Sequence, residues 1–461
     1  MLKDLIARDF CLEISRKLRR MGVLGAIFGA CFAFYVELPL EISIATREAQ
    51  AMMINVEHSV IERVSRSGSG ASTKLILVEK LNPLTIGGAD MAEFEVIFAD
   101  VGQGDCTLIR LPDGEYMLVD INHCPDHGID VFKLLDDVLP DDGDGRKRLK
   151  YLAITHVHDD HITGMGDLYD RYAVEWLWVP QYEDRKQVAK QFGEYQRVID
   201  EHPDEKIKQP QGSRTPLNEK DPDFDLCEGV TVRCFSPPGY IEIEDTLSED
   251  EAKQLVHENC LVLKIAYEGA SVILTGDSNL ACWERILDYY KGRPEEDTGT
   301  EVLKADVLHA SHHGSRTFFK DGGEDTEASL EALETIAPDA VIVSVGEGNR
   351  HDHPHEDMMD AYREQSGEEN VYETRHTGTI VMEIDAGVPY RLVLDTGAYA
   401  EDYGWSDDAD DPGQDATDDR GGSGGGLAAG LVVGAAGLTA AAIAAKHRRG
   451  SPTRLDDQPA A

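Results

Sequence analysis

Short apolar runs and helical repeats of apolar residues alternate between residues 93 and 395, and together they predict a fold of mixed strands and helices. Apolar runs bounded by glycine, proline or aspartate are typical of buried strands. Such runs occur at Glu93–Asp100, Asp105–Leu111, Tyr116–Asp120, Val174–Val179, Val230–Phe235, Cys260–Ala266, Ser271–Leu274, Ala340–Val345, Thr379–Ile384 and Arg391–Leu394. Apolar positions at helical spacing indicate helices at Ile129–Leu139, Asn279–Tyr290, Glu327–Ile336 and Glu356–Gln365. Two batches of strands with helices between them favour an α+β fold, a two-sheet αββα sandwich.

Composition divides the chain into one central domain and two flanks. Residues 91–400 are sufficient for a single domain with a large core. We expect a leader at 1–90 with a signal-like apolar segment at 22–36, an acidic and glycine-rich linker at 401–426, a transmembrane helix at 427–445, and a basic and then polar tail at 446–461. Two alternatives stay open: the true start codon lies near Met91, or residues 427–445 form a soluble helix rich in alanine and glycine.

Basic residues near the two apolar flanking segments set the expected location of the central domain. Arg16–Arg20 precede the first segment, and Lys446–Arg449 follow the last. Because basic residues favour the cytoplasmic side of a membrane, both ends would lie inside and the central domain outside. The expected location is therefore membrane-anchored and extracytoplasmic. A cytoplasmic protein is the alternative.

The balance of charge limits the kind of partner that the chain can bind. Asp and Glu number 87 and Lys and Arg number 44, for a formal net charge of −43. Non-specific binding of nucleic acid depends on basic residues that neutralise phosphates, so this charge counts against a tight general DNA-binding surface. A high-salt habitat would screen the repulsion between acidic groups. The eight cysteines include no Cys-x-x-Cys pair, so we do not expect a cysteine zinc site.

Metal-ligating side chains are concentrated in six residues that follow a buried-strand pattern beginning at Tyr151. These side chains are His156, His158, Asp160 and His161. Imidazole nitrogen and carboxylate oxygen are ligands for Zn²⁺ and similar divalent ions. His156 and His158 would share one ion, and Asp160 with His161 would hold a second. The alternative is a solvated polar loop that happens to contain histidines.

This spacing resembles the His-x-His-x-Asp-His hallmark of the metallo-β-lactamase superfamily. A narrower resemblance, to the hydrolase domain of the ComEC competence proteins and their stand-alone relatives, is carried by the segment Asp-Val-Gly-Gln-Gly-Asp that ends at Asp105. Further matching segments follow in the family's order at 117–120, 274–277, 311–315 and 349–354. The resemblance implies a metallo-β-lactamase αββα sandwich with metal-dependent hydrolase activity.

The resemblance also implies roles for single residues outside the histidine-rich segment. Asp277, which follows a strand and a glycine, would bridge the two ions, although it could instead cap the helix that follows. One of His312 and His313 would complete the second site. Asp120 would orient the metal loop, or else serve only in a turn. His353 would be a further ligand or a proton donor to the leaving group.

One ligand that many relatives carry is missing from its usual Pro-Gly-His segment. Here an insertion follows Gly239, and the next histidine is His257. His257 could substitute for this ligand, but we favour a surface histidine on an acidic loop. The first site would then have fewer nitrogen ligands, or Asn259 would contact metal or substrate. Asp105 and Ser315 are the other predicted substrate contacts. A site poorer in nitrogen would admit Mn²⁺, whereas the histidines favour Zn²⁺.

The predicted activity is hydrolysis of a phosphodiester, in DNA or a nucleotide, by a hydroxide held between two divalent ions. Asp160, Asp277 and His353 are the predicted catalytic residues, and single-stranded DNA is a candidate substrate. The first alternative is hydrolysis of a small ester, lactone or amide with the same ions. The second is a membrane-anchored metal-binding protein without turnover, because a fold does not determine its function. No protein partner follows from the sequence.

Overall fold

Two β-sheets packed face to face form the centre of the fold, in a computed structural model that describes residues 77–80, 92–143, 145–184, 186–292, 299–321, 327–395 and 398–403. The first sheet contains, in spatial order, β1 (Leu77–Lys80), β17 (Arg391–Leu394), β16 (Ile380–Ile384), β2 (Phe94–Phe98), β3 (Thr107–Arg110), β4 (Tyr116–Val119), β5 (Arg148–Ala153), β6 (Ala173–Trp178) and β8 (Ile207–Lys208). The second contains β15 (Val371–Glu373), β14 (Ala340–Val343), β13 (Val307–His309), β12 (Ala270–Leu274), β11 (Val262–Tyr267) and β9 (Thr231–Ser236). A separate parallel pair joins β7 (Tyr182–Asp184) to β10 (Ile241–Ile243).

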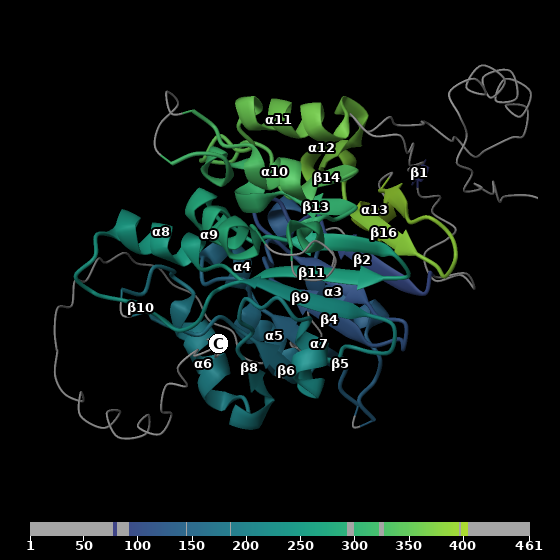
Figure 1. The fold of residues 1–461 in the computed structure, drawn as a ribbon. Coiled ribbons are helices and arrows are strands. Elements are labelled where there is room, and N and C mark those ends of the chain that lie inside the picture. The colour runs from purple at the N-terminus through teal and green to yellow at the C-terminus, as the bar shows by residue number, and fades with distance from the viewer. Residues whose placement is uncertain are drawn as a thin grey trace, which may run out of the picture. The chain divides into compact units, whose positions relative to one another are not determined.

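Helices cover the outer face of each sheet (Figure 1). The first sheet is covered by α3 (Val131–Val138), α4 (Asp159–Ile162), α5 (Met165–Arg171), α6 (Phe192–Glu201) and α13 (Ala398–Tyr403). The second is covered by α9 (Leu280–Tyr290), α10 (Glu331–Ile336) and α11 (Glu356–Ser366). Other helices are α7 (Leu217–Lys220), α8 (Glu249–Glu258) and α12 (Thr374–Thr377), and the 3₁₀ turns lie at Pro125–His127, Asp204–Lys206, Pro222–Phe224, Thr300–Leu303, Ser311–Gly314, Arg316–Phe318 and Glu368–Asn370.

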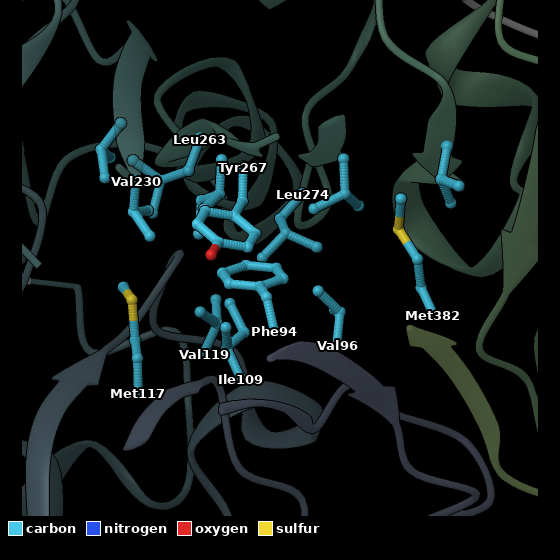
Figure 2. Packing of buried hydrophobic residues seen from close by; sticks show 14 of the residues in the cluster. Phe94, Val96, Ile109, Met117, Val119, Val230, Leu263, Tyr267, Leu274 and Met382 are labelled. Atoms are coloured by element: carbon cyan, nitrogen blue, oxygen red, sulfur yellow. The ribbon is translucent and has the colours of Figure 1, made fainter. Parts of the chain in front are cut away.

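The core between the sheets is built from alternate residues of the strands. Phe94 and Val96 of β2 point toward the second sheet, whereas Ile97 of the same strand packs under the outer helices, because side chains alternate across a strand. Figure 2 shows Phe94 lying against Tyr267 of β11, and their ring centroids are 5.6 Å apart in a stacked arrangement. These contacts fix the two sheets face to face.

The predicted two-sheet sandwich of mixed strands and helices is confirmed, with differences at its edges. The helix predicted from Glu327 begins at Glu331. Two elements extend beyond the predicted domain range 91–400. β1 precedes it and pairs with β17, and α13 ends after it at Tyr403. Among the residues that the structure describes, no helix is long and apolar enough to cross a membrane. The predicted segments at 22–36, 427–445 and 446–461, and nearly all of 401–426, lie outside those residues.

A buried carboxylate that faces a half-buried one on the first sheet makes stability depend on pH. Glu95 of β2 lies directly opposite Glu383 of β16, and it exposes 8% of its surface. Burial, and then the charge of Glu383, raises the pKa of Glu95 from 4.5 to about 7. A raised carboxyl pKa means that the folded chain binds more protons than the unfolded chain. Stability is therefore lost as the pH rises from 4.5 to about 7.

Replacing Glu95 with glutamine is expected to stabilise the fold at neutral and alkaline pH. The free energy of unfolding should rise by about 1–3 kcal/mol at pH 8 and by less than about 1 kcal/mol at pH 5, because the buried charge is absent from the variant. Urea unfolding at the two pH values measures both changes. Glu334→Gln makes the same substitution at an exposed position of α10 and should leave stability unchanged. An equal effect of Glu95→Gln at both pH values would contradict the prediction.

Candidate metal centre

The predicted ligands meet at one edge of the sandwich, where strands of both sheets end. β4 and β5 are parallel neighbours in the first sheet, and β12, β13 and β14 are parallel neighbours in the second. The carboxyl ends of parallel neighbours lie at the same edge of a sheet, so the loops after these strands come together. These loops carry Asp120, the segment His156–His161, Asp277, the pair His312 and His313, and His353.

A first cluster of donor atoms combines three histidines with one aspartate oxygen. It consists of His156, His158, His257 and Asp277. Nδ1 of His158 lies 3.1 Å from Nε2 of His156 and 2.9 Å from Nε2 of His257. Nε2 of His156 and Nε2 of His257 each lie 3.6 Å from Oδ2 of Asp277. Three nitrogens and one oxygen thus face a common point.

A second cluster shares Asp277 and uses its other oxygen. It consists of Asp160, His161, Asp277 and His313. Oδ1 of Asp277 lies 3.0 Å from Nε2 of His161 and 3.8 Å from Nε2 of His313, which lies 3.4 Å from Oδ2 of Asp160. Asp277 is 1% exposed, and its two carboxylate oxygens therefore face two separate clusters.

The polar atoms at the centre of the second cluster are buried and face one another without a hydrogen bond, and this observation tests whether a cation fits. Nε2 of His161, Nε2 of His313 and Oδ1 of Asp277 are buried and accept or donate no hydrogen bond among the described residues. Buried polar groups normally have a partner, because leaving one unsatisfied costs about 1–3 kcal/mol. A divalent cation would satisfy all three atoms, and both donor sets suit one.

Hydrogen bonds on the far side of three of the rings fix which histidine nitrogen faces the clusters. The hydroxyl of Thr155 donates to Oδ2 of Asp120 at 2.6 Å, so Nδ1 of His156 donates to that hydroxyl at 3.1 Å and Nε2 keeps its lone pair. Nδ1 of His161 bonds to Oδ2 of Asp120 at 2.7 Å, and Nδ1 of His313 donates to a backbone carbonyl at 2.9 Å. Asp120 therefore contacts the ring of a cluster residue, as predicted for a residue that orients the metal loop.

Burial and neighbouring charges leave some histidines of the site neutral and others protonated. Burial lowers the pKa of His158 and of His257 well below the ordinary value, so both rings are neutral. Burial alone would raise the pKa of Asp277, but the surrounding imidazoles hold it well below its ordinary range. Burial would lower the pKa of His161 and His313, but the surrounding carboxylates together outweigh it and raise both, Asp277 most strongly. These two rings carry the positive charge that a cation would replace.

The backbone around Asp277 explains the glycine that precedes it. Gly276 has a φ of +50°, and a Cβ there would lie 2.7 Å from Oγ1 of Thr155. Only glycine lets the end of β12 approach the loop after β5 this closely. The side chain of Asn279, and not that of Asp277, caps α9 by accepting from the N–H of Cys282. The alternative reading of Asp277 as a helix cap is therefore wrong.

His312 and His313 occupy a strained turn, and only one of them joins a cluster. Their φ values are +51° and +54°, in the left-handed region that non-glycine residues rarely adopt, at a cost of about 1–3 kcal/mol each. His313 belongs to the second cluster. His312 has a side chain 19% exposed, and its Nε2 lies 3.5 Å from Oδ2 of Asp277. With Asp160, which is 30% exposed, His312 marks the side of the centre that is open to solvent.

His257 is the cluster residue that sequence reasoning misjudged. It is 6% exposed, so the interpretation as a surface histidine is wrong. It lies in the last turn of α8, a helix that begins with a capping box formed by Ser248 and Glu251. The apolar side of α8 packs on β10 around Ile243. The Ser-x-x-Glu signal before an apolar repeat could have predicted this helix, but not where its end would lie.

Three predicted substrate contacts have other partners in the structure. The amide of Asn259 donates to the backbone oxygen of Leu255 at 2.7 Å, and this bond satisfies a carbonyl at the C-terminal end of α8. The hydroxyl of Ser315 accepts from the N–H and from the hydroxyl of Thr317, at 3.4 and 3.3 Å. Asp105 is 4% exposed and faces the inner side of the second cluster. The structure therefore gives these side chains local or supporting contacts.

His353 lies beside the open side of the centre. Its ring centroid is 5.1 Å from that of His312 and 6.3 Å from that of His313. Its Nδ1 is buried and has no hydrogen-bond partner among the described residues. Burial lowers the pKa of His353 to about 3, so the ring is neutral in the metal-free site. It belongs to neither group of ligand atoms.

Comparison with known proteins agrees with this geometry. Residues 99–251 match the family model described as metallo-beta-lactamase superfamily. The match includes the segment His156–His161, whereas His257, Asp277 and His313 lie beyond it. ComE operon protein 3 of Bacillus subtilis (strain 168) is 26% identical over 304 residues, which cover 63% of this chain and 33% of that protein. The chain thus spans about one third of the length of this curated relative.

Solved structures with a similar arrangement are more distant. The metallo-beta-lactamase fold protein YhfI of Bacillus subtilis is 13% identical with a TM-score of 0.34, over 65% of this chain and 99% of that one. Zn²⁺-bound PqqB of Methylobacterium extorquens is 12% identical with a TM-score of 0.37, over 63% of this chain and 100% of that one. From the family match, the chain carries a domain of the metallo-β-lactamase superfamily that includes residues 99–251.

Proposed function

We propose that this chain is a metal-dependent hydrolase that acts on phosphodiesters, with two divalent ions held by the two clusters that share Asp277. The observation that carries the proposal is that the two oxygens of one buried carboxylate belong to two donor sets. The first set has three nitrogens and one oxygen, and the second has two nitrogens and two oxygens. Sites for two neighbouring ions are typical of phosphatases and nucleases. The motif resemblance to ComEC-type hydrolase domains also implies hydrolysis of a phosphodiester bond.

The ligand roles follow from the geometry of the clusters. His156, His158 and His257 would hold the first ion, and Asp160, His161 and His313 the second, with Asp277 shared. When bound, such ions supply a water of lowered pKa and neutralise negative charge that develops on the substrate. The donor set does not distinguish Zn²⁺ from Mn²⁺ or iron, so the identity of the metal stays open.

The chain's own residues at the open side would bind and orient the substrate. His312 presents a partly exposed ring there, and the ring of His353 lies beside it with the two centroids 5.1 Å apart. The side chain of Asp160 is 30% exposed and lies on the same open side. The formal charge of −43 favours a small phosphodiester or a single strand over tight binding of long duplexes. Membrane anchoring and an extracytoplasmic site stay predictions.

The full chain, purified in high and in low salt, is expected to contain two metal ions and to hydrolyse bis-p-nitrophenyl phosphate. Chelation should reduce the rate at least about 1,000-fold, because the ions supply both the nucleophile and the charge stabilisation. Added Zn²⁺ or Mn²⁺ should restore the rate. Mass spectrometry of the metals and a colorimetric assay measure the two properties.

The same preparation tests the alternative functions. Faster hydrolysis of p-nitrophenyl acetate or of a lactone than of the phosphodiester would indicate a carbonyl substrate. Two bound ions without turnover of any of these compounds would indicate a metal-binding protein. A chain that takes up no metal would contradict the proposed function altogether.

A further inference from the structure

The buried carboxylate of Asp105 lies behind both histidines of the second cluster, in addition to the hydrogen-bond partners of their outer nitrogens, which are Asp120 for His161 and the backbone oxygen of Ser344 for His313. Nδ1 of His313 lies 3.4 Å from Oδ1 of Asp105, and Nδ1 of His161 lies 3.8 Å from Oδ2. Each oxygen of the carboxylate therefore faces a different ring. Asp105 is 4% exposed, so this charge is withdrawn from solvent behind the centre rather than at its open side.

The first cluster has no comparable carboxylate behind its rings. Nδ1 of His156 bonds to the hydroxyl of Thr155 at 3.1 Å. The outer nitrogens of the other two rings, Nε2 of His158 and Nδ1 of His257, have no hydrogen-bond partner among the described residues. Within the described part of the chain, the contact with Asp105 thus distinguishes the second cluster from the first.

The backbone around Asp105 is fixed to the loop that carries a second-cluster residue. The N–H of Asp105 donates to the backbone oxygen of Asp160 at 3.0 Å. A Cβ on Gly104 would lie 2.6 Å from that same oxygen and 2.3 Å from the amide nitrogen of Asn122. That amide donates to the backbone oxygen of Gln103 at 2.9 Å. Only glycine permits this close approach, so the turn before Asp105 is built to hold the Asp160 loop.

His309, which the sequence did not single out, closes the arrangement from the second sheet. It lies at the end of β13 and is 2% exposed. Its Nε2 is 3.8 Å from Oδ1 of Asp105 and 2.8 Å from the hydroxyl of Ser344. The backbone oxygen of Ser344 accepts from Nδ1 of His313. Asp105 is therefore surrounded by rings that packing holds in place.

We propose that Asp105 is a positioning residue for the second metal ion, and that its negative charge behind His161 and His313 supports their orientation and strengthens their Nε2 atoms as donors. The inference rests on the proposed function, and it replaces the substrate contact predicted for Asp105. A carboxylate behind a ligating imidazole fixes the ring orientation and makes the ligand more basic. Loss of such a group typically weakens metal affinity about 10–100-fold. Here the loss of affinity should affect the second ion and not the first.

The test is a Mn²⁺ titration of the chelator-treated full chain and of its Asp105→Asn variant, by calorimetry and by electron paramagnetic resonance. The wild type should bind two ions and show the signal of a coupled Mn²⁺ pair. In the variant one of the two ions should bind at least about ten-fold less tightly and the coupled signal should be lost, while the affinity for the other ion changes less than about two-fold. Asp306→Asn removes a carboxylate at the opposite end of β13 and should change neither affinity.

Several outcomes would overturn the inference. Unchanged affinity for both ions, or equal weakening of both, would show that Asp105 does not act on the second ion. A merely structural role would lower the melting temperature of the metal-free chain without changing the ratio of the two affinities. If Asp105→Asn does not fold, Asp105→Ser serves as the smaller uncharged variant in the same titration. A wild-type chain that binds fewer than two ions would overturn the proposed function as well, which separates the two failures.

Discussion

Replacing Asp277 with alanine is expected to remove both metal ions and to lower phosphodiesterase activity at least about 1,000-fold. No other side chain is common to the two clusters of metal-binding atoms among the described residues. Its loss leaves each cluster one oxygen short and leaves the neighbouring imidazoles without the charge that they face. Metal content per chain after dialysis, and the rate with bis-p-nitrophenyl phosphate, measure the two effects.

A matched substitution separates this effect from a general loss of stability. Asp395→Ala also removes a buried carboxylate, but that side chain accepts from the N–H of Tyr399 at the start of α13. It should keep both ions and most of the activity. If Asp277→Ala retained two ions at wild-type affinity, the shared-ligand geometry would be wrong.

The sandwich and half of the candidate centre were predictable because their signals are local. The strands of the core are continuous apolar runs, and their lengths and flanking glycines suffice to place them. His156, His158, Asp160 and His161 lie within six consecutive residues, so their spacing alone predicts a shared site. Asp277 follows the same logic, because it comes directly after a strand that ends at the same edge.

The remaining part of the centre depends on contacts between distant segments. His257 meets His158 across 99 residues, and its position is set by α8 and by the pairing of β7 with β10. No pattern near His257 reports that pairing. The sequence shows a histidine after an acidic stretch, which is typical of a solvated helix end, and burial of its ring follows only from tertiary packing.

Short polar side chains were hard to interpret for a different reason. Asn259 and Ser315 can bond either to a substrate or to their own backbone, and such local bonds are frequent at helix ends and turns. In the structure both side chains bond to groups nearby in the sequence. Asp105 was ambiguous because a glycine-rich turn is typical of an exposed loop near a site. Its burial depends on His309 and His313, which come from the other sheet.

Replacing His257 with alanine is expected to reduce the metal content from two ions to one and to lower the activity about 100-fold. His257 supplies one of three nitrogens to the first cluster, at 2.9 Å from His158. The second cluster has its own donors and should keep its ion. His312→Ala tests the neighbouring ring, whose centroid is 4.5 Å away. Because His312 is not in either cluster, that variant should retain both ions and lose only about ten-fold in activity.

The comparison of the two variants decides which histidine takes the place of the missing ligand. His202→Ala provides the control, since His202 is a buried histidine whose ring contacts Tyr169 and not the centre. It should leave metal content and activity unchanged. The reverse result, with one ion lost in His312→Ala and both retained in His257→Ala, would assign the first site to His312. In that case the close approach of His257 to His158 would be packing at the end of α8, and the insertion would have no part in binding metal.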